Sequence, residues 1–239
     1  MFKWIFAKPL QKNTGIEKIW RDFIQMLETA QKEFALACQV ALHGTDPKPV
    51  EDQLLAYDKA VNKAERSIRK ELVVHCAVRS VIDPDCLIIM SIAKDAERLG
   101  DYSKNIFEMS ELAPYLPEGK ERDELLVLEQ LVLKTFAGCS EIIQSENAEL
   151  AKKIIIDCKW AEVQCDSITK ELLNLPEPTQ RTASDVLMFR FMKRMMSHLR
   201  NISSSVVQPL HKLDFTKKIT KSVEMSGTLL DLKKELGIE

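Results

Sequence analysis

Glycine and proline divide this chain into long uninterrupted segments, and this spacing constrains the fold more than any other feature. The 239 residues include only 7 glycines and 9 prolines, and most of them fall between segments in which apolar residues recur every three or four positions. That recurrence is typical of the buried stripe of a bundle helix. We therefore expect six helices of about 30 residues each and a shorter helical tail. The expected helices span about residues 15–43, 48–81, 84–113, 120–146, 147–175, 180–212 and 216–236.

Two pairs of these segments match each other, which predicts an internal duplication. Residues 97–106 (ERLGDYSKNI) lie over residues 193–202 (KRMMSHLRNI) at an offset of 96, and they share an arginine, an asparagine and an isoleucine. The preceding segments match at an offset of 100. Short connections favour antiparallel neighbours in such units. The expected fold class is all-α, with two tandem antiparallel three-helix bundles and a short C-terminal helix.

The expected organisation has four parts. Residues 1–14 form an apolar and basic N-terminal lead, residues 15–115 the first three-helix unit, residues 118–212 the second unit, and residues 213–239 a helical tail. The lead lacks the apolar run of a secretory signal, and no run of 18 apolar residues is present to span a membrane. We therefore expect a cytoplasmic protein with at most peripheral membrane association.

Charge, cysteine usage and missing motifs exclude several functions. The 34 basic and 36 acidic residues give a net charge of −2, which provides no broad positive field for DNA or RNA, so we expect no nucleic acid partner. The six cysteines form no C-x-x-C pair, and we expect them to be reduced and mostly buried. The sequence has no phosphate-binding glycine loop, no G-x-S-x-G and no H-E-x-x-H. We therefore expect no enzyme.

An acidic pair in the third segment is the candidate functional site. Glu97 and Asp101 are four residues apart and project from adjacent turns of one helix face. That face lies roughly 110 to 150 degrees from the middle of the apolar stripe, so we expect both carboxylates to face outward. Gly100 lies on the apolar side, where we expect it to allow close helix packing. Carboxylate oxygens bind cations, so the pair is a candidate site for iron, zinc or magnesium, with Asp58 and Asn62 of the second segment as its neighbours.

The same residues also allow a simpler interpretation. Lys94, Arg98 and Lys104 each lie three residues from an acidic residue of this helix, and a solvated face of ion pairs needs no metal. In that case the protein is a helical scaffold or oligomerisation module. A redox-active metal bundle is less well supported, because His75 follows Glu71 by four residues rather than by the three of a di-iron E-x-x-H pair.

The stretch from Asp95 to Ile106 (DAERLGDYSKNI) resembles the signature helix of the PhoU-domain family, with the pattern D-x-E-R-[IL]-[GA]-D-[HY]-x-x-N-I. The resemblance covers roughly residues 15–212, because the helix count, the tandem duplication and the preceding helix are also those of the family. It implies a non-enzymatic regulator of phosphate uptake and phosphate signalling. Such a regulator acts by contact with a phosphate transporter component, a sensor histidine kinase or both. We also expect a homo-oligomer.

The resemblance further implies a metal site with the spacing E-x-x-x-D, which falls on Glu97 and Asp101. The matching positions of the second unit hold Lys193 and Ser197, which cannot act as a carboxylate pair. We therefore expect the second metal cluster to be absent and the second unit to serve as a packing or partner surface. A related group of two-unit helical proteins, associated with a second type of phosphate transporter, has a similar MF-x-x-x-F start, which leaves the type of transporter open.

Overall fold

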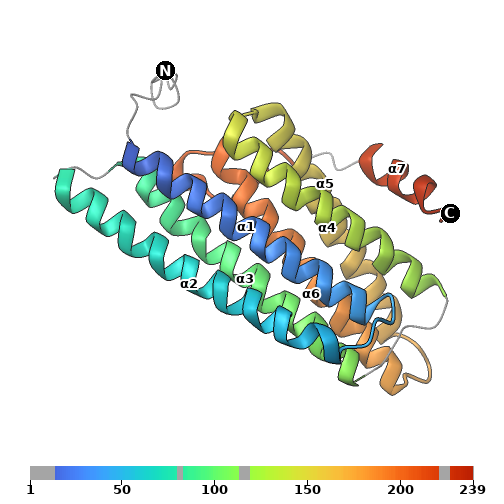
Figure 1. Cartoon of the computed structure of the whole chain (residues 1–239). Helices are drawn as coiled ribbons and strands as arrows, with labels where there is room; N and C mark the ends of the chain where they lie inside the picture. The colour runs from blue at the N-terminus through green and yellow to red at the C-terminus, as the bar shows by residue number, and fades with distance from the viewer. Residues whose placement is uncertain (1–13, 80–82, 113–118, 221–226, 239) are drawn as a thin grey trace.

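The computed structural model describes residues 14–79, 83–112, 119–220 and 227–238. Within these ranges all regular structure is helical, and Figure 1 shows the long helices running along one common direction. Residues 1–13 of the expected N-terminal lead and residues 113–118, at the boundary between the two expected units, lie outside the described residues. The elements are α1 (Thr14–Ala41), α2 (Lys48–Arg79), α3 (Pro84–Leu112), α4 (Lys120–Ser145), α5 (Ala148–Leu173), α6 (Gln180–Val207), the 3₁₀ turn η1 (Leu210–Lys212) and α7 (Gly227–Glu235). The all-α fold class predicted from the sequence is confirmed.

The six long helices form two antiparallel trios that lie side by side (Figure 1). Helices α1 to α3 form the first trio and α4 to α6 the second, and the trios meet where α3 packs on α6 and α1 packs on α4. Tyr102 of α3 and His198 of α6, which are equivalent at the offset of 96, stack with ring centroids 5.7 Å apart. Equivalent residues of two copies touch only near the axis that relates the copies. An approximate twofold axis therefore passes between Tyr102 and His198.

One hydrophobic core runs through both trios. Phe34 of α1 and Phe136 of α4 lie in contact across the junction, with ring centroids 6.2 Å apart. Burial of a large apolar side chain contributes roughly 1.5 to 3 kcal/mol, so this junction is part of the folding core rather than a loose contact between domains. The α6 side chains that fill the core are at most 3% exposed: Met188, Phe189, Met192, Met195 and Met196.

Local capping explains why the second trio breaks where the sequence predicts. Glu146 has a left-handed backbone (φ 54°), and the side chain of Asn147 accepts a hydrogen bond of 3.1 Å from the Leu150 amide at the start of α5. Thr179 and Thr182 form a reciprocal capping box at the start of α6. Caps of this kind satisfy amides that have no partner inside the helix.

The C-terminal part differs from the expectation. The sixth helix was expected to continue to residue 212 but ends at Val207, because Pro209 has no amide hydrogen to donate and its ring blocks the helix. The tail helix was expected over 216–236, but residues 216–220 are not helical, and the helix that the structure describes in the tail, α7, spans Gly227–Glu235. It packs on α4, where Leu232 is 2% exposed and Lys233 Nζ lies 2.8 Å from Glu124 Oε1.

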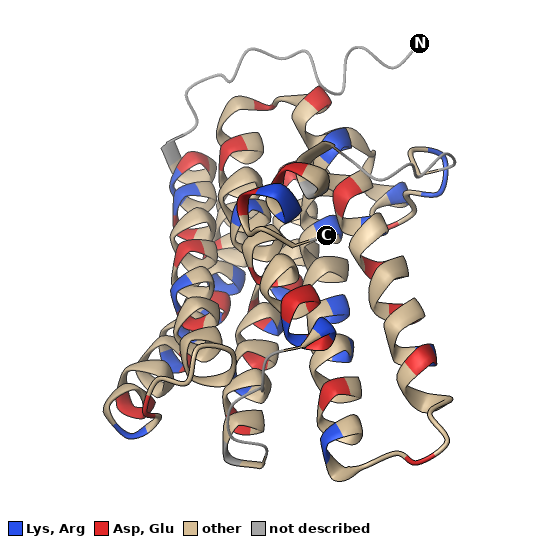
Figure 2. Ribbon diagram, turned by 90° about the vertical axis from the view of Figure 1, so that its right-hand side faces the viewer, with Lys and Arg blue, Asp and Glu red and all other residues tan. Residues whose placement is uncertain are grey.

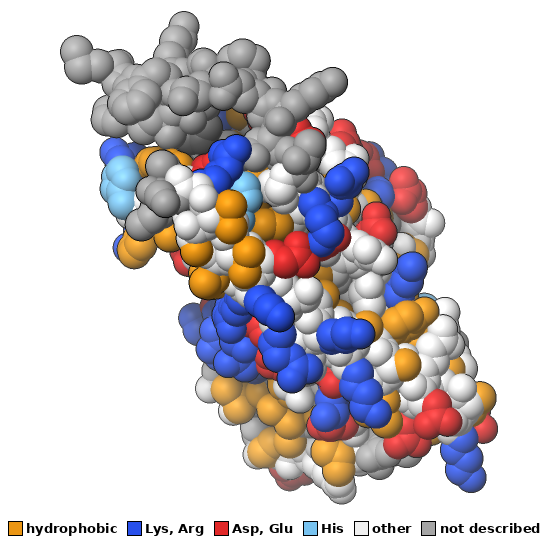
Figure 3. Space-filling view, turned by 60° about the vertical axis from the view of Figure 1, so that its left-hand side comes forward, with side chains coloured by type: hydrophobic (Ala, Val, Ile, Leu, Met, Phe, Trp, Pro, Cys, Tyr) orange, Lys and Arg blue, Asp and Glu red, His pale blue; other side chains and the backbone are white. Residues whose placement is uncertain are grey.

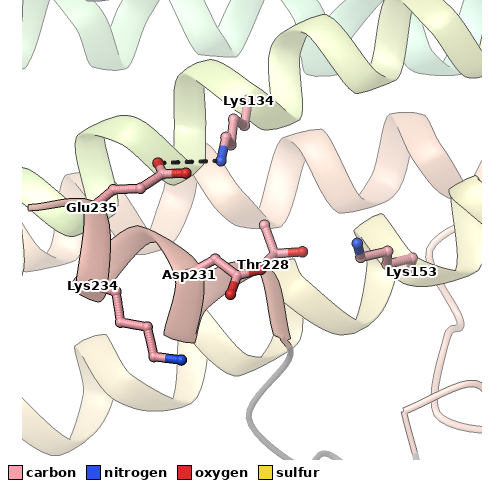
Figure 4. A pocket seen from close by; sticks show the side chains of 6 residues that line it. All are labelled: Lys134, Lys153, Thr228, Asp231, Lys234 and Glu235. Carbon is pink, nitrogen blue, oxygen red and sulfur yellow. Dashed lines mark ion pairs between the residues drawn. The ribbon is translucent and has the colours of Figure 1, made fainter.

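The surface carries charges of both signs on every side that the figures show. Acidic and basic residues are interspersed along the helices in Figure 2. Among the described residues, no helix combines the length and apolar character needed to cross a bilayer. A groove of about 540 Å³ lies between α4, α5 and α7 (Figure 4), and it also mixes the two signs. Its lining consists of Lys134, Lys153, Thr228, Asp231, Lys234 and Glu235.

Candidate functional site

The acidic pair of α3 is held in ion pairs with residues of the same helix. Glu97 Oε2 accepts a hydrogen bond from Lys94 Nζ at 2.5 Å and lies 4.0 Å from Arg98 Nε. Asp101 Oδ2 accepts one from an Arg98 guanidinium nitrogen at 3.1 Å. Arg98 therefore lies between the two carboxylates and offsets the repulsion that their spacing creates.

The two carboxylates differ in exposure, which corrects one expectation. The Asp101 side chain is 37% exposed, whereas Glu97 is only 9% exposed. The prediction that both face outward is wrong for Glu97. Lys94 and Arg98 both hold their charged ends against it, and the long stems of such side chains shield what lies beneath them.

The structure brings the predicted neighbours on α2 into the electrostatic field of this pair. Asn62 Nδ2 donates a hydrogen bond of 3.2 Å to Asp58 Oδ1. Partial burial first, then the Glu97 carboxylate and more weakly Asp58, raise the pKa of Asp101, while Arg98 opposes the rise. Packing of α2 against α3 thus gathers the residues that the sequence singled out.

A further carboxyl group at this site was missed in the sequence. Glu33 of α1 is 0% exposed, and among the described residues neither of its carboxyl oxygens has a hydrogen-bond partner. Burial first, and then the charges of Asp58 and Asp101, raise its pKa to about 9, with Lys104 acting in the opposite direction. At neutral pH the group is therefore protonated.

Space for the Glu33 carboxyl comes from the glycine of α3. A Cβ atom at Gly100 would lie 3.1 Å from Glu33 Oε2 and 3.4 Å from Val61 Cγ1. The prediction that Gly100 permits close helix packing is confirmed. The signal for Glu33 was present in the sequence, because this acid stands on the apolar stripe of α1 between Ala30 and Ala37.

The donor chemistry of the site fits a hard cation, although its present geometry does not enclose one. Oxygen donors from three helices meet here, and the unpartnered Glu33 carboxyl is the kind of group a cation satisfies. Within the described part of the chain, however, no three His, Cys, Asp or Glu side chains are arranged to hold a metal ion. A bound cation would have to displace Lys94 and Arg98 from the carboxylates that they pair with.

Comparison with known proteins identifies the unit that carries this site. Residues 23–110 match the family model described as PhoU domain. The first three-helix unit carries this match, and we refer to it as the PhoU domain. The match begins within α1 and ends within α3, so it includes every residue of the acidic site. The resemblance of the signature helix to the PhoU-domain family is confirmed.

The chain is similar over most of its length to PhoU homologs from other organisms. A phosphate-specific transport system accessory protein PhoU homolog from Xylella fastidiosa is 23% identical over 199 residues, which are 80% of this chain and 83% of the relative. A homolog of the same description from a Synechocystis species is 20% identical over 201 residues, 80% of this chain and 88% of the relative.

Solved PhoU structures have the same fold. The crystal structure of PhoU from Pseudomonas aeruginosa matches with a TM-score of 0.71 at 22% identity, over 82% of this chain and 97% of that one. The phosphate transport system regulatory protein PhoU from Streptococcus pneumoniae matches with a TM-score of 0.70 at 18% identity, over 88% of this chain and 98% of that one. The arrangement of two trios is therefore that of known PhoU proteins.

The second unit places salt bridges where the PhoU domain has its acidic pair. Lys193, at the position equivalent to Glu97, has its Nζ 2.5 Å from Asp166 Oδ2, and Arg190 lies 3.6 Å from the same carboxylate. Arg200 Nε lies 2.7 Å from Glu162 Oε1. Helix α6 is rich in basic residues, but Arg190, Lys193 and Arg200 are paired with carboxylates of α5.

On the face that Figure 3 shows, basic side chains gather across the middle, with acidic ones among them.

A polar cluster joins the PhoU domain to the second unit. Asp95 Oδ1 of α3 accepts hydrogen bonds from His198 Nδ1 at 2.7 Å and from Asn201 Nδ2 at 3.0 Å, both on α6. The positions equivalent to Asp95 and His198 in the other copy are Phe191 and Tyr102, whose rings lie 6.1 Å apart. The twofold axis therefore relates a polar contact on one side to an aromatic contact on the other. The cluster therefore adds polar contacts to the junction between the two units.

Proposed function

We propose that this protein is a non-enzymatic regulator of phosphate uptake that acts by contact with a phosphate transporter component, a sensor histidine kinase or both. The observation that carries the proposal is the extent of the match to the accessory protein from Xylella fastidiosa, which runs over 199 residues and so includes both three-helix units. A match of this length supports a shared role better than a single shared domain does. The PhoU domain at residues 23–110 supports the same role.

The test of this proposal uses the protein in its own cells. Deletion of the gene should change the expression of phosphate uptake genes when phosphate is plentiful, and affinity capture of the full chain should recover a transporter subunit or a sensor kinase. Unchanged expression, together with capture of unrelated proteins alone, would instead support the second candidate function, a helical scaffold or oligomerisation module. That candidate is favoured by the ion pairs of Lys94 and Arg98, which leave Glu97 and Asp101 with partners in the absence of any cation.

We also propose that Glu97 and Asp101 bind a metal ion, with Asp58 and Asn62 beside it. Support comes from the mutual influence of these carboxylates, since Glu97 and Asp58 both raise the pKa of Asp101, and a cation relieves such repulsion. Elemental analysis of the purified chain should find a metal that is lost in the double variant Glu97→Gln, Asp101→Asn. The matched control is Glu108→Gln, an exposed acid on the same helix. Equal metal content in all three proteins contradicts the site.

The proposed location is the cytoplasm and the proposed assembly is a homo-oligomer. All six cysteines are free, which is typical of a reducing compartment. Leu230 of α7 and Leu236, which directly follows the helix, are 45% and 39% exposed, and apolar side chains of this kind can pack on a second copy. Light scattering of the full chain should give the mass of an oligomer, and Leu230→Lys should reduce it. A monomer mass for the unmodified chain contradicts the assembly.

A further inference from the structure

Two cysteines meet at one end of the PhoU domain, outside the acidic site. Cys76 lies just before the end of α2 at Arg79, and Cys86 lies just after the start of α3 at Pro84. Because α2 and α3 are antiparallel neighbours, residues at these two positions lie at the same level of the helical hairpin. The side chains of Cys76 and Cys86 lie close enough for the Cys76 thiol to influence the ionisation of Cys86.

The six thiols differ sharply in their access to solvent. Five of them, at positions 38, 86, 139, 158 and 165, are at most 2% exposed. Cys76 is partly exposed and packs against the edge of the core. A soluble oxidant therefore reaches the Cys76 thiol first. The neighbouring thiol of Cys86 is shielded from solvent.

We infer that Cys76 and Cys86 are a redox modification site. Peroxide oxidises Cys76, and the neighbouring Cys86 thiol then reacts with the product to form a disulfide across the α2–α3 hairpin. This assignment rests on the difference in exposure and on the position of both cysteines at the same end of the α2–α3 hairpin. The environment of Cys86 agrees with its role as the second thiol. Burial first, and then the neighbouring Cys76 thiol, raise the pKa of Cys86 to about 12, so the Cys86 thiol is protonated at neutral pH.

The chemistry needs one molecule of hydrogen peroxide for each disulfide. The Cys76 sulfur attacks one peroxide oxygen, the O–O bond breaks, and the departing hydroxide takes the thiol proton and leaves as water. Cys76 is now a sulfenic acid. The Cys86 sulfur attacks the oxidised sulfur, the S–S bond forms, the S–O bond breaks, and the second hydroxide leaves as water with the Cys86 proton. Two thiols are oxidised and both peroxide oxygens are reduced.

The disulfide would act apart from the proposed cation site. Glu97 lies farther along α3, about 16 Å from Cys86 at the rise of an α-helix. The cross-link would restrain the separation of α2 from α3 at the end of the hairpin while leaving the acidic residues unchanged. Oxidation therefore limits motion of the PhoU domain without altering its charge.

The experiment treats the folded full-length protein with hydrogen peroxide and then counts free thiols after denaturation. We expect the count to fall from six to four, the mass to fall by about 2 Da for the two hydrogens lost, and a peptide containing Cys76 linked to Cys86 to appear on non-reducing digestion. A Cys86→Ala variant should accumulate Cys76 sulfenic acid, which dimedone traps. A Cys76→Ala variant should retain all of its remaining thiols.

A second thiol pair in the same chain provides the matched control. Cys139 and Cys158 lie close enough for their charges to interact, but both are 0% exposed. Their linkage in the peptide map would overturn the inference, because it would mean that exposure does not select the reactive thiol. Retention of all six thiols in the treated protein, or a covalent dimer joined through Cys76, would overturn it as well.

Discussion

Glu33 is a carboxyl group on α1 with no hydrogen-bond partner among the described residues, and its ionisation couples the fold to pH. Asp58 on α2 and Asp101 on α3 face it with like charge, and Lys104 on α3 partly compensates. Its pKa of about 9 in the folded protein exceeds its ordinary value of 4.5. A raised carboxyl pKa means that the folded state holds the proton longer, so this group makes stability fall as pH rises from about 4.5 towards 9.

The substitution Glu33→Gln should remove this pH dependence, because an amide cannot ionise. Urea unfolding at pH 5.5 and at pH 8.5 measures the effect. The free energy of unfolding of the unmodified protein should fall from pH 5.5 to pH 8.5 by at least about 1 kcal/mol more than that of the variant. A shift of one pKa unit corresponds to about 1.4 kcal/mol. Glu28→Gln, at an exposed position of the same helix, serves as the control and should leave the pH slope unchanged. Equal slopes for Glu33→Gln and the unmodified protein would contradict the assignment.

For individual residues of the acidic site, the sequence predicted which ones share a helix but not which ones from different helices come together. The four-residue spacing places Glu97 and Asp101 on adjacent turns whatever the tertiary fold. The burial of Glu97 and the approach of Glu33 depend on how α1, α2 and α3 pack. Desolvation is a tertiary property, so it has no counterpart in sequence spacing.

A substitution at Gly100 tests how closely the helices pack, because the missing side chain lets α3 approach both α1 and α2. A side chain at this position would meet Glu33 Oε2 and Val61 Cγ1 at contact distance or closer. Gly100→Leu should therefore destabilise the protein by about 1 to 3 kcal/mol through overpacking. Ala60→Leu, an exposed position on α2, should change stability by less than about 0.5 kcal/mol. Chemical denaturation of both variants checks this, and an equal effect at the two positions would show that the helices can separate without cost.

The lengths of elements could be predicted where local chemistry decides them. Asn147 and Thr179 cap α5 and α6 through hydrogen bonds to residues three positions farther along the chain. The breaks near residues 146 and 180 therefore agree with the prediction. The tail helix was overextended because a leucine-rich period indicates a helix without fixing its length. A short helix is marginal by itself, and α7 owes its position to the burial of Leu232 against the bundle and to the ion pair of Lys233 with Glu124 on α4.

The duplication was visible in the sequence, whereas the way the two copies meet was not. An offset of 96 relates the two signature helices, but it does not say whether they touch. The structure places Tyr102 on His198 at the axis. Around that axis the first unit has the polar Asp95 and the second has the aromatic Phe191 at the equivalent position, so the junction is asymmetric.

The junction between the units should behave as one coupled element, and a double-mutant cycle on Asp95 and His198 tests this. Each single change to alanine removes this hydrogen bond from a largely buried polar side chain, which costs about 1 to 3 kcal/mol. Because the two side chains share a hydrogen bond of 2.7 Å, their effects should be non-additive by about 0.5 kcal/mol or more. The pair Glu149 and Lys152 on α5, at 2.7 Å but far more exposed, should show almost no coupling. Similar coupling energies for the two pairs would mean that the Asp95–His198 contact behaves as an ordinary surface ion pair, and that apolar contacts such as Phe34 on Phe136 hold the two trios together instead.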